Sequence, residues 1–213
     1  MQIAIPLFDR LTALDAVGPY EVLSRLPGAR VDFVAAEPGT YRTDTRMLGL
    51  TAAKSYDEAA EPDVLVFPGG VGTRKLMHHE PTLDWVRHAH ETTQFTTSVC
   101  TGALVLGAAG VLDGLEATTH WMSRARLAEL GATPVERRVV EQGKVITAAG
   151  VSAGIDMALV LAARIAGPEV AQAIQLGIEY DPQPPFDAGS PDKAPEDVLE
   201  LVRAAEAAEH AQT

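Results

Sequence analysis

Cysteine is almost absent from this 213-residue sequence, which contains only Cys100. One cysteine cannot form an internal disulfide, so the sequence predicts a reducing, cytoplasmic compartment and leaves a free thiol to explain. Basic residues are also scarce, because 17 lysines and arginines stand against 29 acidic residues and give a net charge of −12. That deficit argues against nucleic acid as a partner, since binding it requires a basic face, and solubility is the simplest interpretation of the acidity.

Long apolar runs are missing as well. None reaches the roughly 18 residues that a transmembrane helix needs, and the most helix-like apolar stretch, 153–166, is interrupted by Asp156 and Arg164. The first residues have neither a basic start nor a long apolar segment, so we expect no signal peptide and no membrane association. Hydrophobic residues nevertheless make up 46% of the chain, which is enough for a sizeable core.

Short apolar strands alternate with helical patterns along the chain. Strands are predicted at 2–7, 30–36, 63–67 and 95–99, and helices at 19–26, from Pro81, and at 102–109, 120–130, 152–166, 168–178 and 196–211. A hairpin is expected around Gln142-Gly143, a hairpin or loop at 42–50, and a turn capped by Ser55. This alternation predicts an α/β fold with a mostly parallel sheet covered on both faces. We expect one domain at 1–190, with 191–213 as its C-terminal helical extension.

Three loops are expected to meet at the carboxyl edge of the sheet, where such folds place their sites: 14–19, 68–70 and 99–102. Cys100 ends an apolar strand and begins a helix, and the small residues Gly102 and Ala103 allow close packing behind it. The helix N-terminus favours a thiolate, which is a strong nucleophile. A lone cysteine is more often a small buried apolar residue, but this strand-to-helix elbow favours the nucleophile.

Two further features belong to the same edge. Gly69 and Gly70 follow a buried strand, so the N–H groups of Gly70 and Thr101 are candidates for binding one substrate atom, although Pro-Gly-Gly is also an ordinary turn. Asp15 lies in the first strand-to-helix loop, which we expect to neighbour the elbow. Burial beside a thiolate would raise the pKa of Asp15 and let it carry a proton. Asp also suits a helix N-cap, and both interpretations remain open.

No metal or cofactor site is predicted. His78, His79, His88 and His90 lie on a polar segment without other ligands at suitable spacing, which is typical of a solvated helix face. The glycines at 69–72 lack the spacing and the distal acidic residue of a dinucleotide-binding fingerprint. His120, before Trp121, is expected to pack at a helix start and could reach the pocket.

Several motifs across nearly the whole chain resemble the ThiJ/PfpI superfamily. They are 14–19 (Leu-Asp-Ala-Val-Gly-Pro), 68–70 (Pro-Gly-Gly), 98–103 (Ser-Val-Cys-Thr-Gly-Ala), 117–121 (Ala-Thr-Thr-His-Trp) and 150–156 (Gly-Val-Ser-Ala-Gly-Ile-Asp). Asp at position 15, Thr at position 101 and the segments 175–180, 184–186 and 188–191 are similar to the isonitrile (isocyanide) hydratase branch. The resemblance implies a flavodoxin-like three-layer sandwich, a homodimer, no metal, and roles for Cys100, Asp15 and Thr101. It also implies that Val151 forms an apolar wall of the pocket.

The expected activity is the addition of water to an isocyanide. Cys100 would attack the terminal carbon while Asp15 protonates it, and water would then release an N-substituted formamide. Peptidase-like and glyoxalase-like relatives resemble each other in having His after the nucleophile, where this chain has Thr101. AraC-type regulators share the Cys-Thr-Gly motif but carry a helix-turn-helix region, for which we expect no room here. A glyoxalase-like cysteine enzyme and a non-catalytic redox sensor remain alternatives.

Overall fold

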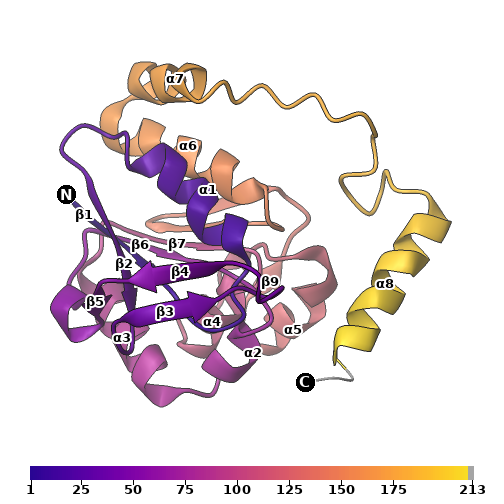
Figure 1. Ribbon diagram of the computed structural model, residues 1–213, viewed down its shortest axis with the longest axis horizontal. Helices are drawn as coiled ribbons and strands as arrows, with labels where there is room; N and C mark the ends of the chain where they lie inside the picture. The colour runs from indigo at the N-terminus through magenta and orange to yellow at the C-terminus, as the bar shows by residue number, and fades with distance from the viewer. Residues whose placement is uncertain (211–213) are drawn as a thin grey trace. The chain divides into compact units, whose positions relative to one another are not determined.

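A mixed, mostly parallel sheet forms the centre of the protein, whose computed structural model describes residues 1–210 (Figure 1). Its strand order is β10-β11-β7-β6-β1-β2-β5, and only the pairing of β10 with β11 is antiparallel. The strands are β1 (Gln2–Pro6), β2 (Arg30–Ala35), β5 (Lys54–Ser55), β6 (Val64–Phe67), β7 (Phe95–Val99), β10 (Val139–Gln142) and β11 (Val145–Ala148). The predicted α/β fold class is therefore confirmed.

Helices cover both faces of this sheet. The helices of residues 1–179 are α1 (Ala13–Leu23), α2 (Thr73–Leu76), α3 (Glu80–Thr92), α4 (Gly102–Ala108), α5 (Arg124–Glu129), α6 (Ala153–Ala166) and α7 (Pro168–Gly177), with short 3-10 helices η1 (Asp57–Ala59) and η2 (Trp121–Ser123). The helix described in residues 180–210 is α8 (Glu196–His210). Helices α1 and α6 pack together on one face, whereas α3 and α4 pack on the other (Figure 1). The sheet is therefore the middle of three layers.

Burial follows the pattern expected of such a sheet. All four residues of β6 are buried, as is typical of a strand with helices on both sides. Helix α4 is buried from Gly102 to Gly107, because it lies between the sheet and its neighbouring helices. The largest fully buried side chains include Ile3, Ile5, Phe67 and Leu106. The strands and helices around the carboxyl edge thus share one continuous core.

Two small sheets flank the central one. Strands β3 (Gly39–Arg42) and β4 (Gly49–Ala52) form an antiparallel hairpin, which confirms the hairpin expected in this region. Strands β8 (Glu116–Ala117) and β9 (Thr133–Pro134) pair in parallel, and β9 was not predicted. The hairpin turn at Gln142-Gly143 is confirmed. So is the cap at Ser55, whose Oγ accepts the Glu58 N–H at 3.3 Å while its own N–H donates to Glu58 Oε2 at 2.8 Å.

Two helix predictions were wrong. Pro19 suggested a helix start, but α1 begins at Ala13 and carries Pro19 in its interior, so Asp15 lies in the first helical turn and not in a loop. The predicted helix 120–130 is divided into η2 and α5. The final predicted helix matches α8 up to His210, and its last residue, Ala211, lies outside the described residues.

The chain divides into two compact units, residues 1–179 and 180–213. The first contains the whole central sheet, and in the described part of the second the one helix is α8, with Leu201 and Val202 exposed. The assignment of 191–213 to the same domain as 1–190 stays a prediction. Of the helices described up to residue 210, none is long and apolar enough to cross a membrane.

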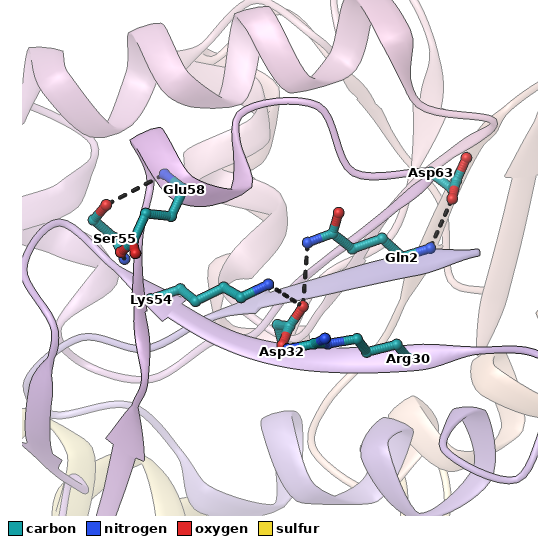
Figure 2. A network of polar contacts seen from close by, with 7 residues as sticks. All are labelled: Gln2, Arg30, Asp32, Lys54, Ser55, Glu58 and Asp63. Atoms are coloured by element: carbon teal, nitrogen blue, oxygen red, sulfur yellow. Dashed lines mark hydrogen bonds and ion pairs between the residues drawn. The ribbon is translucent and has the colours of Figure 1, made fainter.

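A polar network joins β1, β2 and β5 (Figure 2). Asp32 of β2 accepts hydrogen bonds from Lys54 at 2.8 Å and from Gln2 and Arg30 at 3.1 Å. Gln2 also donates its backbone N–H to Asp63 at 2.6 Å. These contacts attach the short edge strand β5 to its neighbour β2, and β2 to β1.

Candidate active site

The turn between β7 and α4, called the elbow below, places Cys100 above the carboxyl edge of the sheet. Its backbone φ is +56°, a left-handed value that a non-glycine residue adopts only under local constraint. The constraint is visible, because the Cys100 N–H donates to the carbonyls of Ala148 and Ala149 at 3.1 and 3.0 Å. A Cβ on Gly102 would lie 2.1 Å from the Phe67 carbonyl oxygen, so the helix can begin there only with glycine. The predicted strand-to-helix elbow is therefore present.

Further contacts surround the cysteine. Its carbonyl accepts the hydroxyl of buried Thr119 at 2.8 Å. Its sulfur receives the backbone N–H groups of Thr101, at the start of α4, and of Val151, just after β11. The residue is buried, with 5% of its surface exposed. The elbow is thus held by neighbours on both sides of β7.

Asp15 of α1 is completely buried. Its Oδ2 accepts the Gly69 N–H at 2.9 Å. Oδ1 has no hydrogen-bond partner among the described residues, although the carboxyl group and the Cys100 thiol are close enough to shift each other's pKa. Burial raises the pKa of Asp15 to about 7, an effect that the Gly69 N–H and the thiol oppose and the charge of Asp44 reinforces. Asp15 can therefore carry a proton near neutral pH, as the sequence predicted.

The alternative interpretation of Asp15 as a helix cap is wrong. The N-cap of α1 is Thr12, and the Asp15 side chain points to a different segment of the chain. The expectation that Asp15 neighbours the elbow is confirmed, although β6 lies between β1 and β7. Asp15 meets the elbow from the first turn of α1, not from the loop after β1.

The Cys100 thiol differs from the prediction of an easily formed thiolate. Burial and the negative charge of Asp15 raise the pKa of Cys100, and the N–H groups of Thr101 and Val151 only partly offset this. The pKa values of both members of the pair are therefore raised. Above a pH of about 7, Asp15 loses its proton and its negative charge helps the Cys100 thiol to keep its own, so the pair then holds one proton.

The Gly69-Gly70 segment lies between these groups, and its N–H groups already have partners. Gly69 donates to Asp15, and Gly70 donates to Thr101 Oγ1 at 2.9 Å, while that hydroxyl donates back to the Gly70 carbonyl at 3.2 Å. The predicted pairing of the Gly70 and Thr101 N–H groups on one substrate atom does not match this arrangement. Instead, Thr101 holds the segment that holds Asp15.

No side chain fits where these two glycines lie. A Cβ at Gly69 would lie 2.7 Å from Asp15 Oδ2 and 2.6 Å from the Thr101 nitrogen. At Gly70, which has φ +132°, it would lie 2.5 Å from the backbone of the β1–α1 loop. The glycines thus allow the close backbone approach that Pro-Gly-Gly suggested, but the backbone approaches Asp15, Thr101 and the β1–α1 loop of the protein itself.

The two remaining predicted residues lie beside the elbow. Val151 has a φ of +21°, and its half-buried side chain packs against the core, while its backbone N–H faces the Cys100 sulfur. His120 is half-buried, and its ring lies over Gly150, where a Cβ would be 2.6 Å from His120 Cδ2. Contact of either side chain with substrate stays a prediction.

The other histidines are not gathered into a site. His78, His79 and His88 are exposed, whereas His90 is half-buried and its Nδ1 shares a hydrogen bond with Thr96 Oγ1 at 2.9 Å. In the part of the chain that the structure describes, no three potential metal-ligating side chains come together.

Sequence reasoning missed three parts of the site: the Val151 N–H, the Thr119 hydroxyl and the contribution of Asp44. Each comes from a segment whose place depends on the strand order or on the β3–β4 hairpin. The motifs around Thr119 and Val151 were the available signal for two of them. Nothing in the sequence singled out Asp44.

The chain is similar in sequence and fold to known proteins. The model of the DJ-1/PfpI family matches residues 1–164. The isonitrile hydratase of Pseudomonas putida is 45% identical over 203 residues, which cover 95% of this chain and 89% of that protein.

Solved structures are similar as well. A ThiJ/PfpI family protein from Pseudomonas syringae superposes with a TM-score of 0.93 at 38% identity, covering 97% of this chain and 86% of the other. DJ-1beta of Drosophila melanogaster, at 22% identity, has a TM-score of 0.77 over 84% of this chain and 97% of its own and shares the fold. With the family match over most of its length and a cysteine elbow at the centre of its site, this chain belongs to the DJ-1/PfpI family.

Proposed function

We propose that this protein is an isonitrile hydratase, which converts an isocyanide and water into an N-substituted formamide. The observation that carries the proposal is the Cys100–Asp15 pair: an elbow thiol beside a buried carboxyl with a pKa raised to about 7 and one oxygen without a partner. The similarity to the Pseudomonas putida enzyme supports the same activity. The substrate is thus a small molecule.

The first step adds the thiol across the terminal carbon of the isocyanide. That carbon must gain a proton and a carbon–sulfur bond, so an acid and a nucleophile have to reach the same atom. The proton shared by Cys100 and Asp15 moves through the carboxyl to the carbon, and the sulfur electron pair forms the new bond. The product is a thioimidate, with the substrate nitrogen doubly bonded to a CH group that carries the sulfur, and Asp15 is left as a carboxylate.

The second step uses that carboxylate as a base. Asp15 takes a proton from water as the water oxygen attacks the thioimidate carbon, and it passes that proton to the substrate nitrogen, so that Asp15 is again a carboxylate. The resulting tetrahedral species carries OH, sulfur and NH on one carbon. Its collapse breaks the carbon–sulfur bond, forms the formamide carbonyl and returns the hydroxyl proton to the Cys100–Asp15 pair.

The N–H groups of Thr101 and Val151 stabilise the negative charge that sulfur carries as it attacks and leaves. Their direction toward the sulfur supports this role. The Thr101 hydroxyl has a positioning role, because its hydrogen bonds with Gly70 fix the segment whose neighbouring N–H holds Asp15. His120 and Val151 are proposed to line the space beside the sulfur.

The test uses purified protein and an aryl isocyanide. Loss of the isocyanide stretching band and appearance of the formamide by mass spectrometry are expected with the natural sequence, and Cys100→Ala should abolish both. A 2-oxoaldehyde serves as the comparison substrate, for which we expect no hydroxyacid. Formamide production by Cys100→Ala at a rate near that of the natural protein would reject the mechanism, and its absence with the natural protein would reject the function.

A homodimer and a cytoplasmic location complete the proposal. The resemblance of the chain to its family supports the dimer, and the single cysteine supports a reducing compartment. Light scattering coupled to size-exclusion chromatography should give twice the 22.6 kDa chain mass, and a single-chain mass would contradict the dimer.

A further inference from the structure

Thr12, the residue before α1, connects three parts of the site. Its N–H donates to the Gly69 carbonyl at 2.9 Å, and its own carbonyl accepts the Asp15 N–H at 3.1 Å. Because the Gly69 N–H in turn donates to Asp15 Oδ2, the three residues form a closed ring of hydrogen bonds. The position of Asp15 therefore depends on where Thr12 lies.

The Thr12 side chain is used in an unusual way. Threonine at an N-cap ordinarily accepts an N–H from the first helical turn, a contact worth about 1 kcal/mol. Here Thr12 makes no such cap and its hydroxyl donates to Asp44 Oδ2 at 2.9 Å. The start of α1 is thus attached to the β3–β4 hairpin in place of being capped.

Backbone hydrogen bonds hold Asp44 in place within the β3–β4 hairpin. Asp44 donates its N–H to the Leu11 carbonyl at 2.9 Å, and Leu11 forms a bridge with Thr43. The other carboxylate oxygen of Asp44 accepts the Thr45 N–H at 2.7 Å. Both oxygens of Asp44 are therefore engaged, one within the hairpin and one with Thr12.

We propose that Asp44 is a positioning residue for the reaction: through Thr12 it fixes the start of α1 and keeps the Asp15 carboxyl facing Cys100. This inference rests on the proposed function. The charge of Asp44 acts in the same direction, because a second carboxylate nearby disfavours ionisation of Asp15 and raises its pKa. The titratable groups that face Asp15 are the Cys100 thiol from the elbow and Asp44 from the hairpin.

Two substitutions separate the hydrogen bond from the charge. Asp44→Asn can keep its one oxygen for the Thr45 N–H and donate its amide N–H to the Thr12 hydroxyl, which can accept as well as donate. The contact with Thr12 is kept and the charge is removed, so the acidic limb of the kcat/KM profile should move to lower pH by a few tenths of a unit while kcat stays within about twofold. Thr12→Val keeps the charge but removes the hydrogen bond, so kcat should fall by about tenfold with little change in KM. Thr12→Ser should restore kcat.

The matched control is Asp57→Asn, which removes one charge from an exposed position on η1. Circular dichroism and thermal unfolding establish that each variant is folded. If Thr12→Val does not fold, the single variants Asp44→Asn and Thr12→Ser provide the test. Titration of the Asp15 carboxyl by carbon-13 NMR provides a measurement that does not need turnover. We expect its pKa to fall in Asp44→Asn and to remain unchanged in Asp57→Asn.

The outcomes distinguish this inference from the proposed function. If Asp44→Asn and Thr12→Val behave like Asp57→Asn in the pH profile, in kcat and in the Asp15 titration, Asp44 has no positioning role, and formamide production would still support the hydratase. If the natural protein makes no formamide, the function is rejected. The Asp15 titration then still decides whether Asp44 and Thr12 act on that carboxyl.

Discussion

Two carboxyl groups in the same domain have opposite environments. Asp32 has a side chain that is 11% exposed, and although burial alone would raise its pKa, hydrogen bonds from Lys54, Arg30 and Gln2 together with the charge of Lys54 lower it (Figure 2). Asp15 is completely buried, with one backbone N–H, a thiol and a like-charged neighbour around it, and its pKa is raised to about 7. The first group supports the fold as an anion, whereas the second is arranged to keep a proton.

The two groups change the stability of the fold with pH in opposite ways: Asp32 stabilises it more at higher pH, and Asp15 stabilises it more at lower pH. The pKa of Asp32 is lower in the folded protein, so its contribution is present above its unfolded pKa and is lost as the pH falls through the folded value. The pKa of Asp15 is higher in the folded protein, so the fold is most stable with Asp15 protonated and loses that advantage as the pH rises from about 4 to about 7. A catalytic carboxyl of this kind therefore lowers stability at the pH where it works.

The largest effect is expected for Asp15→Asn. The amide can neither deliver the proton to the substrate carbon nor activate water, so turnover should fall by at least about a thousandfold while the fold is retained. Asp32→Asn should keep turnover within about twofold, because Asp32 belongs to the network that joins β1, β2 and β5. Both rates are measured as formamide production. Equal losses in the two variants would mean that the comparison does not separate catalysis from structure.

The next effect is the pH dependence of stability. Between pH 5 and pH 8 the natural protein should lose about 2–3 kcal/mol from Asp15 alone, a loss that Asp15→Asn lacks. Urea unfolding of both proteins at the two pH values measures the difference. As the pH falls, the free energy of unfolding of the natural protein should rise relative to that of Asp15→Asn. A constant difference between pH 5 and pH 8 would show that the pKa of Asp15 is not raised.

The sequence predicted the elbow well because its determinants are local. Strand β7 has the predicted bounds, Phe95–Val99, and the turn that follows it at Cys100 is set by the residues immediately around it. Gly102 signalled a close approach, and the structure places it against the Phe67 carbonyl. Here an apolar strand, a turn and a run of small residues are sufficient to predict the local structure.

The surroundings of Asp15 were harder to predict, because they depend on contacts between distant segments. Pro19 is a common helix-start signal, and tertiary packing overrode it: a Cβ on Gly18 would lie 3.1 Å from Ile155 of α6. The strand order that brings the Val151 N–H to the elbow, and the hairpin that brings Asp44 to Thr12, leave no local pattern. The charge of Cys100 was misjudged for the same reason, since burial and the Asp15 charge outweigh the helix N-terminus.

The smallest effect concerns the stability of Asp32→Asn. Asparagine keeps an oxygen for one donor but loses the charge that attracts Lys54 and Arg30, so at pH 7 we expect a loss of about 1 kcal/mol in urea unfolding. The loss should stay the same between pH 5 and pH 8, in contrast to Asp15→Asn. It should shrink as the pH falls through the lowered pKa of Asp32, and in high salt, which screens the partly exposed pair. Asp57→Asn provides the control for removing one negative charge, and a loss that is equal in both variants would assign the effect to net charge and not to the network.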